Sequence, residues 1–212
     1  MSNTRIQRRM EALKASGRKA LIPYIVAGDP TPTVTVPAMH AVVEAGADII
    51  ELGMPFSDPF ADGPVNQRGA ERAIKSGMTL AGVVKTVSEF RKDDNDTPIV
   101  LMGYLNPVIA MGETVFCEAA AAAGVDGLLI VDMPPEEEGS LVQSAKMHGL
   151  DLIYLAAPTT TDERLQTIGK ATSGYLYYVS LKGITGSSKL DTSDVSQRVA
   201  YMRQHVSVPI CV

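Results

Sequence analysis

Short apolar runs alternate with amphipathic stretches along the whole chain. The runs are typical of strands that are buried on both faces, whereas the stretches between them repeat their apolar positions at helical spacing. The predicted strands are 20–27, 48–52, 98–104, 125–131, 150–156, 174–180 and 208–212. The predicted helices are 6–16, 33–45, 66–75, 80–91, 113–123, 136–148, 161–172 and 195–205. This alternation predicts right-handed βαβ units around one parallel sheet.

Two α/β architectures satisfy this order, an open doubly wound sheet and a (β/α)8 TIM barrel. Polar segments rich in glycine and proline follow the strands, and their spread over nearly every strand favours the barrel. These segments are 28–30, 55–64, 106–107, 132–135, Pro158 and 183–188. No G-x-G-x-x-G follows the first strand, which weakens the dinucleotide-binding alternative.

A complete barrel of this type usually needs about 250 residues. Here the seventh predicted strand begins at Val208 and the sequence stops at Val212. We therefore expect residues 1–212 to form a single barrel domain that is incomplete, lacking most of strands seven and eight and their helices. An open barrel of this kind exposes two strand edges, which invites association.

Composition narrows the possible partners. The chain is 45% hydrophobic, has a formal net charge of −5 and a pI near 5.2. An acidic balance argues against nucleic acid or an anionic membrane as a major partner. No apolar run approaches the length of a membrane span, and the polar N-terminus lacks the apolar core of a secretion signal. We expect a cytoplasmic protein.

The cysteines and histidines indicate no metal site. Cys117 and Cys211 lie far apart, and the three histidines are scattered without ligand spacing. We therefore predict free thiols and no metal.

One predicted strand carries a carboxylate inside its apolar run. Alternation places Glu51 on the same strand face as Ile49 and Gly53, so Glu51 points toward whatever that face encloses. The loop that follows carries two more carboxylates, Asp58 and Asp62, either of which could work with Glu51. A buried carboxylate needs a partner or a function. Glu51 is either paired with a basic group or a helix end, or it is an acid/base catalyst that works with a carboxylate of the loop.

Five segments of the chain resemble one family, the alpha subunit of tryptophan synthase. The longest of them has few parallels elsewhere, and the likeness extends from Ile6 to Val212. The segments are Pro23-Tyr-Ile-Val-Ala-Gly-Asp-Pro30, Glu51-Leu-Gly-Met-Pro-Phe-Ser-Asp-Pro-Phe-Ala-Asp-Gly-Pro64, Gly103-Tyr-Leu-Asn-Pro107, Asp132-Met-Pro-Pro-Glu-Glu137 and Ser180-Leu-Lys-Gly-Ile-Thr-Gly186.

The resemblance implies a (β/α)8 barrel lyase that uses no metal and no organic cofactor. Its reaction is the retro-aldol cleavage of indole-3-glycerol phosphate to indole and glyceraldehyde 3-phosphate in tryptophan biosynthesis. It implies that Glu51 is the acid/base and that Asp62 accepts the indole N–H. Indole leaves only after its C3 is protonated, which places positive charge near the ring nitrogen, so an ionised Asp62 stabilises that form while Glu51 moves protons. We assign a raised pKa to Glu51 because it lies in an apolar strand.

The resemblance also implies further site residues and a partner. The expected indole pocket is lined by Tyr24, Tyr104, Leu129 and Tyr177, and the loop after strand six offers Thr185 and Gly186 to close the site and hold phosphate. Alternation agrees for Tyr177, which shares a strand face with Tyr175 and Val179, although strand aromatics also serve as plain core. A beta subunit is expected to meet Pro55, Phe56 and Asp58 in an α2β2 assembly that passes indole directly to the partner.

Two departures from the family keep other hypotheses open. Lys182 follows strand six, where a class I aldolase places a Schiff-base lysine, but a solvated lysine is the simpler interpretation. The family's main phosphate cradle, built from loops after strands seven and eight, lies beyond Val212. For these 212 residues we therefore expect weak or no activity, and a catalytically silent binding module is the second hypothesis. A different aldolase-type lyase that uses Lys182 is the third.

Overall fold

The computed structural model describes residues 4–137, 139–180 and 192–212. Among these residues, parallel strands form a five-stranded sheet in the order β1-β2-β3-β4-β5 and a three-stranded sheet in the order β6-β7-β8. The strands are β1 (Tyr24–Val26), β2 (Ile50–Gly53), β3 (Ile99–Gly103), β4 (Gly127–Ile130), β5 (Asp151–Leu152), β6 (Leu155–Ala156), β7 (Leu176–Tyr178) and β8 (Ile210–Cys211).

Helices connect the strands, and all the strand pairings are parallel. The helices are α1 (Arg5–Ala15), α2 (Pro32–Glu44), α3 (Pro64–Lys75), α4 (Leu80–Phe90), α5 (Leu105–Met111), α6 (Glu113–Ala123), α7 (Ser140–Met147), α8 (Asp162–Ala171) and α9 (Thr192–Met202). Over the described ranges, no helix is both long enough and apolar enough to cross a membrane.

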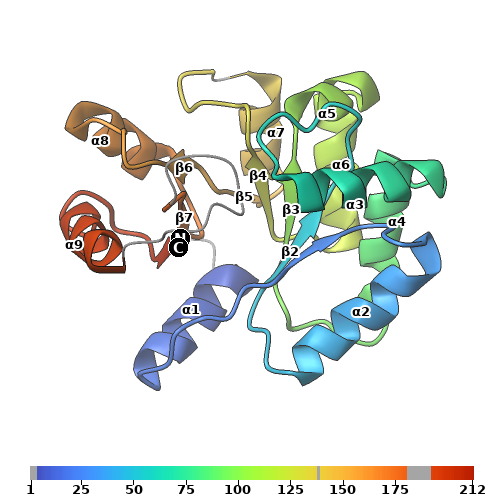
Figure 1. The fold of residues 1–212 in the computed structure, drawn as a ribbon, viewed down its shortest axis with the longest axis horizontal. Helices are drawn as coiled ribbons and strands as arrows, with labels where there is room; N and C mark the ends of the chain where they lie inside the picture. Colours follow the sequence, from blue (N-terminus) through green and yellow to red (C-terminus); the bar gives the residue numbers. More distant parts are fainter. Residues whose placement is uncertain (1–3, 138, 181–191) are drawn as a thin grey trace.

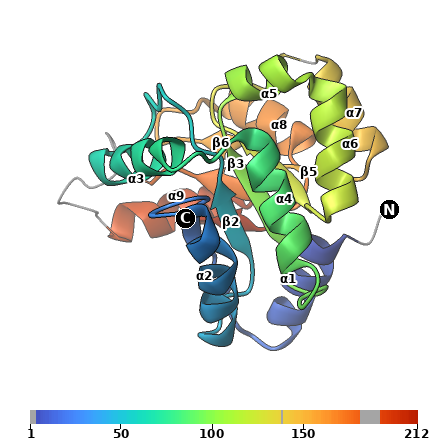
Figure 2. The ribbon, with the colours of Figure 1, turned by 90° about the vertical axis from the view of Figure 1, so that its right-hand side faces the viewer.

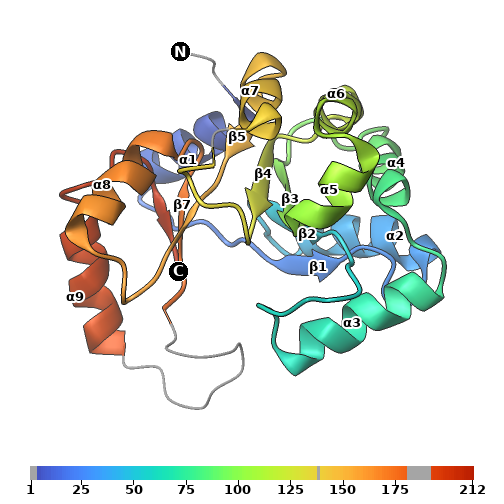
Figure 3. The ribbon, with the colours of Figure 1, turned by 90° about the horizontal axis from the view of Figure 1, so that it is seen from above.

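The strands stand in the middle of the molecule with helices α2 to α9 around them (Figures 1 and 3). Two apolar clusters follow from this arrangement. The larger cluster packs between the strands and the surrounding helices, and the smaller one fills the space that the strands enclose. The smaller cluster contains Val100 of β3 and Leu129 of β4, together with Ile49, Ile153 and Tyr175, which lie just before β2, just after β5 and just before β7. This arrangement is a TIM barrel, as the alternation of elements predicts.

Helix α1 closes the end of the barrel where the strands begin. Figure 2 shows α1 at the opposite end of the molecule from α5, which follows the end of β3. Ile6 of α1 is fully buried in the inner cluster. Thr4 donates to the Asp151 carboxylate at 2.8 Å, and Arg5 donates to Asp126 at 2.9 Å. Because both aspartates lie at the starts of strands, α1 is bound to the floor of the barrel by polar contacts as well as by apolar packing.

Several element limits differ from the sequence-based prediction, among them those of α5, of α7 and of the fifth predicted strand. Helix α5 was expected as a loop because of Pro107, but Pro107 is the third helical residue, where the backbone N–H needs no partner within the helix. Helix α7 begins at Ser140 and not at 136. The fifth predicted strand, 150–156, is divided into β5 and β6, which pair with β4 and β7 respectively.

Candidate active site

Glu51 is a buried carboxylate in the barrel interior. It lies in the middle of β2, where every residue is buried, and its residue surface is only 4% exposed. The neighbouring strands pair with it in register, Tyr24 on β1 and Val100 on β3. The inward orientation predicted from strand alternation is therefore confirmed, and no basic side chain is recorded as an ion-pair partner of Glu51 within the described part of the chain.

The partner of Glu51 is a phenol. Tyr175, just before β7, donates from its hydroxyl to Glu51 Oε1 at 2.6 Å. Burial raises the pKa of the Glu51 carboxyl from its ordinary 4.5 to about 7, although the hydrogen bond from Tyr175 lowers it. This agrees with the raised pKa predicted for Glu51. A carboxyl that titrates near neutrality can both donate and accept a proton at physiological pH.

Groups around Glu51 keep their protons. Burial, reinforced by the nearby Glu51 charge, raises the pKa of the Tyr177 phenol to about 12 and that of the Cys211 thiol to about 12. The same two causes, in the same order, raise the pKa of the Tyr175 phenol far above its ordinary value. At neutral pH these groups are therefore neutral, and Tyr175 remains a hydrogen-bond donor to Glu51.

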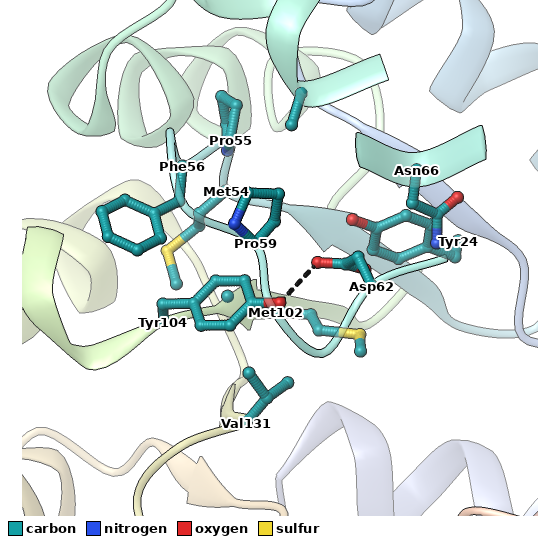
Figure 4. Close-up of a pocket in the computed structure, with 12 residues that line it drawn as sticks. Tyr24, Met54, Pro55, Phe56, Pro59, Asp62, Asn66, Met102, Tyr104 and Val131 are labelled. Atoms are coloured by element: carbon teal, nitrogen blue, oxygen red, sulfur yellow. Dashed lines mark hydrogen bonds between the residues drawn. The ribbon is translucent and has the colours of Figure 1, made fainter. Parts of the chain in front are cut away.

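The second carboxylate is held by another tyrosine. Tyr104, at the end of β3, donates to Asp62 Oδ2 at 2.7 Å, and the Ala61 backbone N–H donates to the Tyr104 hydroxyl oxygen at 3.1 Å (Figure 4). Burial is the main reason that the pKa of Tyr104 is raised, followed by its hydrogen bond to Asp62. The loop between β2 and α3 is thus fixed to the end of β3, and no hydrogen bond to the other Asp62 side-chain oxygen is formed by the described residues.

A pocket lies beside Asp62 at the ends of the strands. Figure 4 shows Tyr24, Asp62 and Tyr104 on its walls. The pocket is lined by Tyr24, Met54, Pro55, Phe56, Pro59, Asp62, Asn66, Ala70, Met102, Gly103, Tyr104 and Val131. Apolar and aromatic walls with one carboxylate suit a flat apolar ring that carries a single hydrogen-bond donor.

Tyr24 packs closely against Gly53. A Cβ at Gly53 would lie 2.3 Å from the Tyr24 hydroxyl oxygen and 2.6 Å from Cζ, so no larger residue fits while this phenol is in place. Burial raises the pKa of Tyr24, and the charges of Asp62 and Glu51 raise it further. The phenol is therefore neutral at neutral pH and lies near enough to both carboxylates to be affected by their charges.

The other predicted pocket residues fall in different places. Leu129 is fully buried in the inner cluster and is not among the residues that line the pocket. Tyr177 packs against the same cluster, which confirms its inward orientation. Thr185 and Gly186 lie outside the described residues, as does Lys182.

The residues predicted to face a partner lie on the loop above the pocket. Asp58 is exposed and accepts a hydrogen bond from Ser57, while Pro55 and Phe56 are half-buried and also line the pocket. The Phe56 and Tyr104 rings have centroids 5.4 Å apart. This loop therefore contacts solvent on one side and the pocket on the other.

Cys117 and Cys211 are free thiols, as predicted. In the ranges that the structure describes, no three His, Cys, Asp or Glu side chains are grouped as metal ligands.

Sequence reasoning missed several residues of the site, and Tyr175 is the most important of them. The sequence did indicate that Tyr175 points inward, since it shares a strand face with Tyr177. Alternation predicts the direction of a side chain, however, and not its hydrogen bond to Glu51. Met102 and Val131 were missed for a similar reason. Each lies two positions beyond an inward-facing residue, Val100 or Leu129, on the same face of its strand.

Comparisons with known proteins agree on one family. The family model for the tryptophan synthase alpha chain matches residues 10–212. The tryptophan synthase alpha chain of Laribacter hongkongensis is 58% identical over 208 residues, which are 98% of this chain and 79% of the relative. That of Nitrosococcus oceani is 57% identical over 209 residues, 99% of this chain and 77% of the relative.

The similar solved structures belong to the same family. The crystal structure of tryptophan synthase subunit alpha from Legionella pneumophila superimposes with a TM-score of 0.91 at 44% identity, and the match covers 99% of this chain and 77% of that one. A chain of Mycobacterium tuberculosis tryptophan synthase gives 0.89 at 33% identity, over 98% of this chain and 79% of that one.

Proposed function

This chain belongs to the tryptophan synthase alpha chain family, and we propose that Glu51 and Asp62 are the residues that carry out its chemistry. The activity is that of an indole-3-glycerol-phosphate lyase in tryptophan biosynthesis, which releases indole and glyceraldehyde 3-phosphate. The observation that carries the proposal is the buried Glu51 carboxyl, whose pKa near 7 suits a group that must give and take a proton in one catalytic cycle.

In the proposed mechanism Glu51 moves two protons. Protonated Glu51 gives its proton to indole C3, and the resulting carboxylate accepts the proton of the glycerol hydroxyl next to the scissile bond. As that hydroxyl becomes a carbonyl, the C–C bond breaks, and its electron pair returns to the indole ring. Proton count and charge balance without a metal or an added reagent. Tyr175 keeps the Glu51 carboxyl oriented throughout.

Asp62 stabilises the charge that forms in between. Protonation at C3 leaves positive charge near the ring nitrogen, and the N–H becomes a stronger donor. A carboxylate whose orientation is fixed by Tyr104 at 2.7 Å is ready for that charge without reorganising. The apolar walls of the pocket, which include Met102 and Val131, support the binding of the indole ring beside it.

We propose that Tyr24, Tyr104 and Tyr177 contact the substrate. Tyr24 and Tyr104 line the pocket, and Tyr177 faces the same interior. We retain the sequence-based roles of Leu129 in lining the indole pocket and of Thr185 and Gly186 in closing the site and holding phosphate.

The partner is a tryptophan synthase beta subunit that receives the indole, and we propose that it binds the loop of Pro55, Phe56 and Asp58 in an α2β2 assembly in the cytoplasm. Exposed Asp58 and 70% exposed Phe60 on this loop support the proposal. A loop that borders both the pocket and solvent suits the direct transfer of indole.

We also propose that residues 1–212 form a single (β/α) barrel domain that lacks most of strands seven and eight and their helices. β5 and β6 together occupy one position, and β8 pairs with β7 as the seventh strand. The chain covers 77–79% of the length of its relatives, which supports this proposal.

The deciding experiment measures indole release from indole-3-glycerol phosphate, with and without a beta subunit, for the wild-type chain and for Glu51→Gln. Loss of activity in Glu51→Gln, with the circular dichroism spectrum unchanged, is the expected result. Equal activity of the variant and the wild type would remove Glu51 from the mechanism. A wild-type chain that binds the beta subunit but stays inactive, both alone and extended through strand eight, would favour the binding module.

A further inference from the structure

Helix α3 is attached to the loop after β1 by a two-pronged ion pair. Arg72 Nε donates to Asp29 Oδ1 at 2.7 Å, and Arg72 Nη2 donates to Asp29 Oδ2 at 2.8 Å. Near the end of the helix, Ser76 Oγ donates to the Pro30 carbonyl oxygen at 3.0 Å. These bonds join positions 43 and 46 residues apart, so they fix two separate segments relative to each other.

Polar contacts set the position of α3 because its apolar contribution is small. The buried residues of α3 are Gly69, Ala70 and Ala73, which remove little side-chain area from water. A Cβ at Gly69 would lie 3.2 Å from Asp29 Oδ2, so the helix backbone rests closely against the carboxylate that Arg72 holds. Figure 3 shows α3 beside β1, whose end leads into this loop.

The same helix carries the turn that presents Asp62. Helix α3 begins at Pro64, two residues after Asp62, and Gln67 in its second turn donates from Nε2 to the Asp62 carbonyl oxygen at 2.9 Å. Asn66 and Ala70 of α3 also line the pocket. A tilt or shift of α3 therefore moves the Asp62 carboxylate relative to the pocket.

We propose that Asp29 and Arg72 are positioning residues for Asp62. By holding α3 against the loop after β1, the pair keeps the Asp62 carboxylate aimed at the indole N–H, and this inference rests on the role proposed for Asp62. Side chains that are 52% and 22% exposed usually add little to stability through their charges. The bidentate geometry of the pair instead restrains the position of α3. A misplacement of about 1 Å of a catalytic group reduces the rate about a hundredfold.

Ligand selectivity tests the inference without catalysis. The chain has no tryptophan, so fluorescence excited at the long-wavelength edge of the indole band, beyond the absorption of its tyrosines, reports the ligand. Indole binding is measured directly and benzofuran binding by displacement of indole, because benzofuran keeps the ring shape but has oxygen in place of N–H. The preference for indole then measures how well Asp62 meets the N–H, and for the wild type we expect about tenfold or more.

Arg72→Gln and Asp29→Asn should each reduce this preference toward the value of Asp62→Asn, and Arg72→Lys, which keeps the charge without the fork, should lie in between. The matched control is Lys75→Gln, which removes the exposed pair with Glu71 on the same helix and should leave the preference unchanged. Combining Arg72→Gln with Asp62→Asn should add nothing to Asp62→Asn alone.

The outcomes separate the two proposals. If Asp62→Asn keeps the wild-type preference, the role of Asp62 is wrong. If Asp62→Asn lowers it and the Arg72 and Asp29 variants do not, the positioning role is wrong. If wild type binds no indole, both are overturned. Thermal melting by circular dichroism checks folding, and Arg72→Lys and Asp29→Asn carry the test if Arg72→Gln does not fold.

Discussion

The Tyr175 hydroxyl lies 2.6 Å from Glu51 Oε1, although the two residues are 124 positions apart in the sequence. This hydrogen bond joins β2 to the segment that leads into β7 across the barrel interior. It favours the charged carboxylate, whereas burial favours the neutral form and has the larger effect, so the pKa settles at about 7. Two opposing effects therefore set the acidity of the proposed catalytic group, and each can be changed separately.

Removal of the phenol should move the pKa of Glu51 upward. Tyr175→Phe deletes the hydrogen bond that lowers this pKa and leaves the burial that raises it. The inflection assigned to Glu51 in the pH profile of kcat/KM should therefore shift to higher pH. Tyr177→Phe is the control, since no hydrogen bond to Glu51 is recorded for Tyr177 among the described residues. An inflection that stays in place in Tyr175→Phe would assign it to another group.

Glu51 should also make stability depend on pH. Its pKa is higher in the folded chain than its ordinary 4.5, so the folded state holds the proton more tightly. The associated stability is fully present below about pH 4.5 and is lost as the pH rises through about 7. Over this window wild type should lose up to about 3 kcal/mol relative to Glu51→Gln, which does not titrate. Urea unfolding of both proteins from pH 4 to 8 measures the difference, and parallel curves would contradict it.

Asp62 and Tyr104 should behave as one unit. Asp62→Asn removes the charge that faces the indole nitrogen, and we expect kcat/KM to fall about 10²- to 10³-fold. Tyr104→Phe removes only the 2.7 Å hydrogen bond that orients that charge, and about a tenfold loss is expected. The double variant should be no worse than Asp62→Asn. Losses that multiply in a steady-state assay would show that Tyr104 acts independently of Asp62.

Leu129 and Val131 differ in burial on the same side of the barrel. Leu129 is fully buried in the inner cluster, and Leu129→Ala should lower the free energy of unfolding by about 2–5 kcal/mol. Val131 lines the pocket, so Val131→Ala should change KM at a smaller cost in stability. Denaturant unfolding combined with steady-state kinetics compares them. A larger stability loss in Val131→Ala than in Leu129→Ala would contradict this division.

The sequence predicted elements well where a local rule fixes their ends. Helix α6 has the predicted limits because Gly112 and Gly124, with φ of 93° and 90°, bound it on both sides. The first strand was predicted too long, over 20–27, because an apolar run reports burial, whereas only Tyr24–Val26 pair with β2. A strand of this kind is delimited by its neighbour and not by its own residues.

In the candidate site too, some features follow from a local rule and others depend on residues far away in the sequence. Strand alternation alone predicted that the Glu51 side chain points inward, because the direction of a side chain depends only on its position along β2. The bonds from Tyr175 to Glu51 and from Tyr104 to Asp62 join residues more than 40 positions apart, and no local pattern encodes them. The inward direction of Glu51 was therefore predictable, whereas the hydrogen bonds by which Tyr175 orients Glu51 and Tyr104 orients Asp62 were not.

The attachment of α1 to the barrel floor has a consequence for the order of folding. Thr4 meets Asp151 across 147 positions and Arg5 meets Asp126 across 121, so α1 is synthesised long before its partners exist. Contacts between such distant positions form late and slow the search for the native state. Until then Ile6 and the apolar barrel floor are both open to water, and this interval during synthesis is when the nascent chain is most prone to aggregate.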